Sequence, residues 1–153
     1  MPIPFDDIDA INAEVTGDWG EFGAEVEVSQ EMINGFADLT GDHQWIHVDV
    51  ERCQRESPFG GPIAHGFLTL SLMPQLMELP IEVTGATNIV NYGSAGLQFR
   101  RPVPAGSTIH ARSRLVKAEK HLAGTLVTFE SSIHVKDSRK ASLTYTSLIL
   151  FQG

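Results

Sequence analysis

Residues 67–79 read FLTLSLMPQLMEL, and apolar side chains occupy almost every position of this stretch. A helix that is apolar nearly all round lies inside a protein rather than on its surface. Pro74 falls within the stretch, where it should kink the helix and free the carbonyl of Leu70. The hydroxyl of Thr69 or Ser71 could compensate for this locally. The stretch therefore predicts a long, kinked and buried central helix.

The chain after residue 84 predicts the sheet that covers this helix. Residues 88–99 hold two short strand-like pieces around Gly93 and Gly96, and three longer alternating segments follow. These segments are residues 108–117, 125–136 and 141–151. Within the first of them, one face carries Ile109, Ala111, Ser113 and Leu115, and the other carries His110, Arg112 and Arg114. Consecutive strands joined by short polar turns predict an antiparallel meander.

The chain before the central helix predicts one more strand and two helices. Residues 24–28 alternate as a half-buried strand does, and a lone strand is not stable, so this one must join the sheet. Ser29 can cap a helix that keeps helical spacing up to Gly41, where a glycine can end it in the left-handed conformation. Asp49 can cap a second, shorter helix over residues 50–55.

Together these elements predict a single α+β domain over residues 1–153, with a curved antiparallel sheet wrapped around a long central helix. A length of 153 residues suits one domain. A single sheet wrapped on one helix leaves an edge strand unpaired, and pairing across a two-fold axis covers such an edge. We therefore expect a homodimer.

Composition limits the classes of partner. The hydrophobic fraction of 42% and the charged fraction of 20% are ordinary for a soluble globular protein. The net charge of −8 provides no basic field for a nucleic acid. Residues 1–10 lack a basic leader, and no apolar run is long enough to cross a membrane. The single cysteine, Cys53, excludes an intrachain disulfide and suits a reducing compartment, so we expect a cytoplasmic protein.

A carboxylate and an imidazole follow the predicted helix stop at Gly41. The segment 40–49 reads TGDHQWIHVD, and Asp42 and His47 stand five residues apart, an awkward spacing on one helix. A loop could instead turn both side chains towards one point, where they would hold and polarise a water molecule for general acid–base chemistry. The alternative is that Asp42 caps the next helical turn and His47 is an ordinary surface or core histidine.

His65 and Gly66 begin the predicted central helix. The first N–H groups of a helix have no partner within it, and Gly66 has no side chain to block a ligand, so an acyl oxygen that gains negative charge could bind there. The alternative is that the glycines at 60, 61 and 66 only make a tight turn and a close helix–sheet contact.

These two segments resemble the MaoC-like dehydratases, the hydratase 2 or (R)-specific enoyl-CoA hydratase group of hot-dog fold. Residues 36–47 read FADLTGDHQWIH, and residues 59–66 read FGGPIAHG. The family has the forms Ser/Thr-Gly-Asp-x-Asn-Pro-Ile/Leu-His and Phe-Gly-x-Pro-Ile-x-His-Gly. Residues 91–93 and 99–106 are similar to later strands of the subgroup related to nodulation protein N. The resemblance spans residues 24–151, with Gln44-Trp45 in place of the family's Asn-Pro.

The resemblance implies reversible syn addition of water to a trans-2-enoyl-CoA, giving a (3R)-3-hydroxyacyl-CoA. It assigns Asp42 and His47 to the catalytic dyad and the Gly66 N–H to the thioester oxygen. The expected substrate-binding residues in the matching motifs are Gln44, His65, Asn91 and Tyr92. No cofactor is required, since coenzyme A is part of the substrate. No metal is expected either, because the histidines lack metal-ligand spacing.

Two questions stay open in the sequence. The phosphates of coenzyme A require cations, which could be Arg100, Arg101, Arg112 and Arg114, or Lys117 and Lys120, although a solvated sheet face explains the same residues. The Gln44-Trp45 departure also permits a hot-dog protein that holds an acyl thioester without converting it. A thioesterase on the same fold is a third, lower-ranked possibility.

Overall fold

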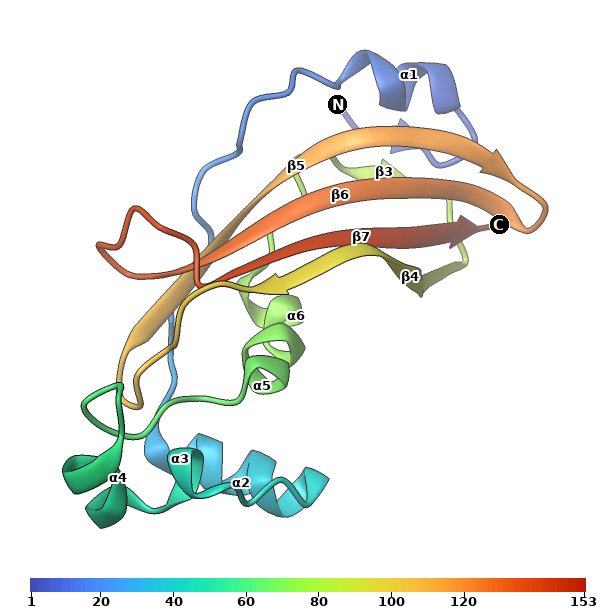
Figure 1. The fold of residues 1–153 in the computed structure, drawn as a ribbon. Helices are drawn as coiled ribbons and strands as arrows, with labels where there is room; N and C mark the ends of the chain where they lie inside the picture. The colour runs from blue at the N-terminus through green and yellow to red at the C-terminus, as the bar shows by residue number, and fades with distance from the viewer.

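The computed structural model describes residues 1–153, and its main feature is a strongly curved antiparallel sheet (Figure 1). The strands are β1 Ile3–Pro4, β2 Val26–Glu27, β3 Val83–Thr84, β4 Asn88–Phe99, β5 Thr108–His121, β6 Gly124–Val135 and β7 Leu143–Gln152. The helices are α1 Ile8–Ala13, α2 Gln30–Thr40, α3 Trp45–Val48, α4 Val50–Glu56, α5 Gly66–Ser71 and α6 Met73–Leu76.

The main sheet has five strands in the order β2-β5-β6-β7-β4, and every neighbouring pair is antiparallel. The predicted meander is β5-β6-β7, and the predicted first strand joins it at the edge of β5. The segment 88–99 is one continuous strand rather than two pieces. Its register shifts at two places, between Asn91 and Gly93 and between Ser94 and Gly96, so the glycines mark irregularities and not strand ends.

The predicted central helix is wrong in its length and continuity. It consists of two short helices, α5 and α6, and the chain leaves helical geometry at Met77. Pro74 lies in the first turn of α6, where a missing N–H costs nothing, so it begins a new helix instead of kinking an old one. The hydroxyls of Thr69 and Ser71 bond to the carbonyls of His65 and Phe67, not to that of Leu70.

The concave side of the sheet holds α5 and α6 (Figure 1). One core cluster joins these helices to the sheet through Leu68, Leu72, Leu76, Ile109, Ala111, Ile133 and Leu143. The predicted burial of residues 67–79 is incomplete, because Phe67 is 63% exposed. Burial along β5 follows the predicted alternation, with Ile109, Ala111, Ser113 and Leu115 all buried.

A second core cluster lies towards the other end of the sheet, where α1 packs on β5. Ile11 of α1 is completely buried in it. The Asn12 side chain bonds to both backbone groups of Ala118, next to the register shift between Leu115 and Lys117. The parallel pair β1–β3 beside this cluster was not predicted, because two-residue strands carry no periodic signal.

The remaining helices lie beyond one end of the sheet, where α2, α3 and α4 gather on the side from which α5 begins (Figure 1). Ser29 caps α2 and Asp49 caps α4, as the sequence predicts. None of the helices combines the length and the apolar character needed to cross a membrane. This group of helices places the candidate site at that end of the sheet.

Candidate active site

The turn after α2 places Asp42. Gly41 takes the left-handed conformation with φ 81°, and its N–H bonds to the carbonyl of Ala37, so the helix ends where the sequence predicts. Asp42 follows in a short exposed loop, and its Oδ1 accepts from the Gln44 N–H. The loop is shorter than predicted, because His47 does not belong to it but lies in the single turn of α3.

Asp42 and His47 nevertheless converge. One carboxylate oxygen of Asp42 and one ring nitrogen each of His47 and His65 lie within 4.8 Å of one another. Two polar atoms at such a separation can share one water molecule, since each hydrogen bond to it spans about 2.8 Å. Asp42 is exposed and His47 is only 6% exposed, so the pair joins a solvated acid to a sheltered base.

The hydrogen bonding of His47 determines which nitrogen can act. Nδ1 lies 2.7 Å from the carbonyl oxygen of Ile63, and because a carbonyl only accepts, Nδ1 carries the proton. The other nitrogen, Nε2, therefore presents a lone pair. Burial lowers the pKa of His47, and the nearby His65 acts in the same direction, whereas the Ile63 bond and Asp42 oppose the shift. His47 is thus a neutral base at neutral pH.

Ile63 is itself held by backbone contacts. Its N–H donates to the carbonyl of Ile46, and it forms an isolated antiparallel bridge with Pro104. The neighbouring Ala64 N–H donates to the carbonyl of Val103. The carbonyl that orients His47 therefore belongs to a segment fixed to the connection between β4 and β5.

His65 supports the site rather than lining it. Its side chain is buried, with 3% of the residue exposed, and Nε2 lies 2.9 Å from the backbone carbonyl oxygen of Asp42. The ring stacks on His47 with centroids 3.9 Å apart and planes 26° apart. Its Nδ1 is buried without a hydrogen-bond partner. The structure thus ties the His65 ring to the two predicted dyad residues and gives it no position on the pocket wall.

The two rings also constrain metal binding. Asp42, His47 and His65 have ligand-type atoms close enough to consider a shared ion. The lone pair of an imidazole lies in the ring plane, and a zinc ion sits about 2.0–2.1 Å along it. Rings stacked at 26° have nearly parallel planes, so their lone pairs do not point to one common ion. The donor arrangement therefore does not fit a metal held by both histidines.

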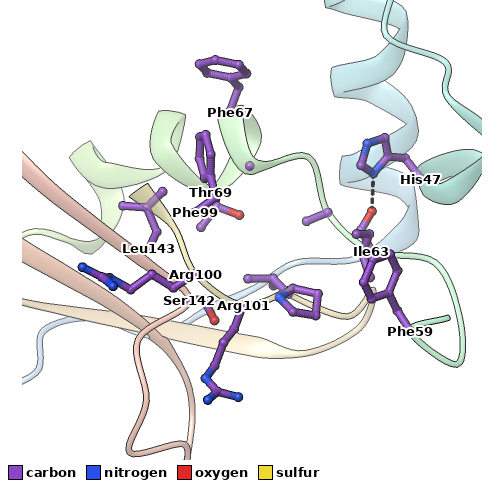
Figure 2. A pocket seen from close by; sticks show the side chains of 14 residues that line it. His47, Phe59, Ile63, Phe67, Thr69, Phe99, Arg100, Arg101, Ser142 and Leu143 are labelled. Atoms are coloured by element: carbon purple, nitrogen blue, oxygen red, sulfur yellow. Dashed lines mark hydrogen bonds between the residues drawn. The ribbon is translucent and has the colours of Figure 1, made fainter. Parts of the chain in front are cut away.

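A pocket of about 380 Å³ opens beside His47 (Figure 2). Its wall is formed by His47, Phe59, Ile63, Ala64, Gly66, Phe67, Thr69, Phe99, Arg100, Arg101, Pro102, Val103, Ser142 and Leu143. The side chains of Phe67, Phe99 and Leu143 form an apolar part, and Arg100 and Arg101 form a basic part. The pocket therefore suits a molecule with an apolar end and an anionic end.

Gly66 is a pocket residue at which there is no room for a side chain. It is the first residue of α5, and its N–H lies ahead of the first intrahelical bonds. A Cβ atom added at Gly66 would lie 2.6 Å from ring atoms of Phe99. Gly66 therefore lines the pocket with its backbone alone, and no side chain at this position covers it.

The other predicted binding residues lie outside the pocket. Gln44 precedes α3, is exposed and makes no side-chain cap bond. The guanidinium carbon of Arg52 lies 4.1 Å from the ring centroid of Trp45, and Trp45 does not line the pocket. Asn91 and Tyr92 are exposed on β4, roughly 25 Å along the strand from Phe99, which is the pocket residue of that strand. Within this chain they do not reach the site, since strand length separates them from it.

Several pocket residues were missed or left open by the sequence. Of the six candidate cations only Arg100 and Arg101 line the pocket; Lys117 pairs with Glu119, and Arg114 pairs with Glu130. Thr69, Phe99 and Ser142 were not singled out as site residues. For Phe99 the signal was present, because it directly precedes Arg100-Arg101-Pro102 in a recognised motif.

Comparison with known proteins identifies the family. The family model described as "MaoC like domain" matches residues 12–137. The "3-hydroxyacyl-thioester dehydratase Z" of Mycobacterium tuberculosis is 43% identical over 127 residues, which cover 82% of this chain and 83% of that protein. "Nodulation protein N" of Rhizobium meliloti is 39% identical over 136 residues, which cover 83% of this chain and 80% of that protein.

A solved structure shows the same fold. The (R)-hydratase from A. caviae involved in PHA biosynthesis superimposes with a TM-score of 0.68 at 21% identity, over 86% of this chain and 97% of that one. The curved antiparallel sheet is thus the hot-dog fold that the resemblance implied. With the family match and the dehydratase relatives, this shows that the chain belongs to the MaoC-like dehydratase family, and with it to the hydro-lyases.

Proposed function

We propose that the protein is an (R)-specific enoyl-CoA hydratase that reversibly adds water to a trans-2-enoyl-CoA to give a (3R)-3-hydroxyacyl-CoA. The observation that carries this proposal is the convergence of the Asp42 carboxylate with the imidazole of His47, whose Nε2 is free, beside a pocket that Gly66 helps to line. The curated relatives named as dehydratases and the structural likeness to an (R)-hydratase support the reaction class.

Each residue has a defined role in this mechanism. A water molecule held between Asp42 and His47 gives a proton to Nε2 of His47 as its oxygen bonds to Cβ of the enoyl group. The proton that His47 takes up is passed to Cα with the help of Asp42, so that the hydroxyl and one proton of a single water are added and both side chains return to their starting state. The Gly66 N–H stabilises the negative charge that develops on the thioester oxygen, and one such donor typically contributes about 3 kcal/mol. The reverse sequence is dehydration.

The pocket lining supports a thioester of coenzyme A as substrate. The apolar wall of Phe67, Phe99 and Leu143 fits an acyl chain, and Arg100 and Arg101 provide charge for the phosphates of the carrier. Arg100 and Arg101 also border a neighbouring depression with Lys140. This gives the acidic chain a local basic patch at the site, which a coenzyme A ligand requires.

We also propose that the working unit is a homodimer formed along β4, without nucleic acid or membrane as partner. β4 is a sheet edge, paired only with β7, and it leaves Ile89, Val90, Tyr92 and Phe99 exposed. An exposed, apolar edge strand invites pairing with another copy. Because β4 ends at Phe99 in the pocket wall, such pairing would bring the partner close to the site.

We further propose that the reaction uses no metal or other cofactor and takes place in the cytoplasm. Acid–base chemistry on a thioester needs only the groups named above. The stacked geometry of His47 and His65 argues against an ion between them. The one thiol, Cys53, is buried, and burial raises its pKa, which fits an inert cysteine in a reducing compartment.

The proposal is tested by following the ultraviolet absorbance of crotonyl-CoA with purified protein. Loss of the enone band is expected with the wild type, together with formation of the (3R) product on chiral analysis, and the loss should disappear in His47→Ala and in Asp42→Asn. His43→Ala is the matched control, because His43 pairs with the exposed Asp38 and does not line the pocket.

Two outcomes would contradict the hydratase assignment. Saturable binding of enoyl-CoA with no absorbance loss at any chain length would indicate an acyl-thioester binding protein. Release of free thiol from acyl-CoA would indicate a thioesterase.

A further inference from the structure

A second pocket lies on the face of the sheet turned away from α5 and α6, which we call the outer face. Its volume is about 410 Å³, and it shares no residue with the pocket beside His47. It is lined by Phe22, His110, Arg112, His134, Asp137, Ser138 and Arg139. The proposed reaction uses none of these residues.

Arg112 in this pocket has no partner for its charge. The ion pairs of the chain involve other residues, and the neighbouring Arg114 on the same strand is neutralised by Glu130 and donates to the carbonyl of Gly17. In addition, Nε of Arg112 is buried without a hydrogen-bond partner. A buried donor on a charged group is costly unless something accepts from it. All three guanidinium nitrogens of Arg114 therefore have a partner, whereas no hydrogen bond or ion pair engages those of Arg112.

Aromatic rings hold the Arg112 side chain in place. Its guanidinium carbon lies 5.1 Å from the ring centroid of Phe22 and 5.2 Å from that of Trp19. Phe22 in turn stacks on His110, with centroids 3.8 Å apart and planes 9° apart. A guanidinium fixed against aromatic rings is oriented before a ligand arrives, so less conformational entropy is lost on binding.

The turn between β6 and β7 closes the pocket and is also held in place. His134 bonds through Nδ1 to the Ser138 carbonyl and through Nε2 to the Ser132 hydroxyl, so both of its nitrogens are engaged. Asp137 in this turn has φ 68°, the one positive φ outside glycine. The groups with free donors are thus His110, Arg112 and Arg139, and the one carboxylate among the lining residues is Asp137.

We propose that this outer-face pocket binds an oxyanion, a phosphate or a carboxylate group, on the guanidinium of Arg112. The two terminal nitrogens of the planar guanidinium, which are not among the buried atoms of the chain, match two oxygens of such a group. The exposed Arg139 also lines the pocket, so two positive charges, Arg112 and Arg139, stand against the single negative charge of Asp137. The site is separate from the coenzyme A phosphates assigned to Arg100 and Arg101.

The test is a titration of the whole protein followed by backbone amide resonances. Sodium phosphate and sodium acetate are added in separate experiments, with sodium chloride at matched ionic strength as the baseline. Saturable shifts confined to residues around positions 22, 110–112 and 137–139 are expected. Tighter binding of phosphate identifies a phosphate site, and tighter binding of acetate identifies a carboxylate site. Shifts that grow linearly without saturation, or that chloride reproduces, would overturn the proposal.

Two variants link the binding to Arg112. Arg112→Gln should weaken binding by about tenfold to a hundredfold, because a charged hydrogen bond pair is lost. Arg114→Gln is the matched control on the same strand and should change binding by less than about twofold, because Glu130 already occupies Arg114. Equal weakening in both variants would show general charge screening and refute the site. Should Arg112→Gln not fold, Arg112→Lys keeps the charge without the fork; undiminished binding by that variant would also refute the site.

Discussion

The imidazole rings of His47 and His65 stack with centroids 3.9 Å apart, and this contact joins the two segments that build the site. His47 comes from the turn of α3, and His65 immediately precedes α5. Through its Nε2, His65 also holds the backbone carbonyl of Asp42. One buried ring therefore sets the positions of both the base and the carboxylate.

Replacing the His65 ring should test whether it positions the catalytic groups without taking part in the reaction. His65→Phe keeps an aromatic ring against His47 but cannot donate to the Asp42 carbonyl, so the Asp42 loop should loosen. We expect kcat for crotonyl-CoA to fall about tenfold or more with a smaller change in KM, because misplacing a catalytic group acts on the transition state. Steady-state kinetics check this. Wild-type kcat in His65→Phe would show that the contact has no role in positioning.

The pH dependence of activity should follow His47. Burial lowers the pKa of His47, so its neutral form persists below the ordinary value of 6.5. We expect kcat/KM to stay level from neutral pH down past 6.5 and to fall only at more acidic pH, as Nε2 is protonated. A pH–rate profile measures this. A fall that begins above pH 7 would contradict a neutral, buried base.

The free energy of unfolding, like kcat/KM, should fall at acidic pH. Burial lowers the folded-state pKa of both His47 and His134, so in the acidic range the unfolded chain binds more protons than the folded one. The stability contributed by the two neutral histidines is complete above about pH 6.5, the ordinary pKa of histidine. It is lost as the pH falls from there through the lowered pKa values of the folded state. Denaturant unfolding between pH 8 and pH 5 should therefore show a falling free energy of unfolding.

His134→Gln separates the two pH effects. His134 lies in the outer-face pocket, away from the proposed chemistry. This variant should have a shallower dependence of stability on pH and an unchanged acid limb of kcat/KM. A changed activity limb would show that the two histidines do not titrate independently.

Gly66→Ala should impair activity through Phe99. The new methyl group would lie 2.6 Å from the Phe99 ring and must push it aside, into the pocket or out of the wall. We expect a loss of about 1 kcal/mol in unfolding free energy, since Phe99 is partly exposed and can move, with a larger loss in kcat/KM. The double variant Gly66→Ala/Phe99→Ala should recover the stability. Unaltered activity in Gly66→Ala would show that neither the added methyl group nor the displaced Phe99 ring obstructs the site, because alanine keeps the backbone N–H.

The dimer should depend on the exposed face of β4. Val90→Lys places a charge on the unpaired edge strand and should shift the protein towards monomer. Light scattering after size-exclusion chromatography measures the mass. Leu122→Lys, at the exposed tip between β5 and β6, is the control and should leave the mass unchanged. A dimer that persists in Val90→Lys would place the interface elsewhere.

The sheet and the start of the site could be predicted from the sequence because their signals are local. Alternation along β5 follows from the pleat, and the stop at Gly41 follows from a conformation that glycine adopts easily. The break between α5 and α6 was not predicted, because apolar periodicity does not distinguish one helix with a proline from two helices. The His65–Asp42 bond joins residues 23 positions apart and leaves no mark on either segment.

The bond from His47 to Ile63 reaches beyond the site itself. Ile63 is fixed by its bridge to Pro104, so the ring orientation of the base depends on how the connection between β4 and β5 meets the chain before α5. Natural variation in either of those connections could retune the proton affinity of the enzyme while every catalytic side chain stays the same. Relatives with identical motifs can therefore differ in working pH.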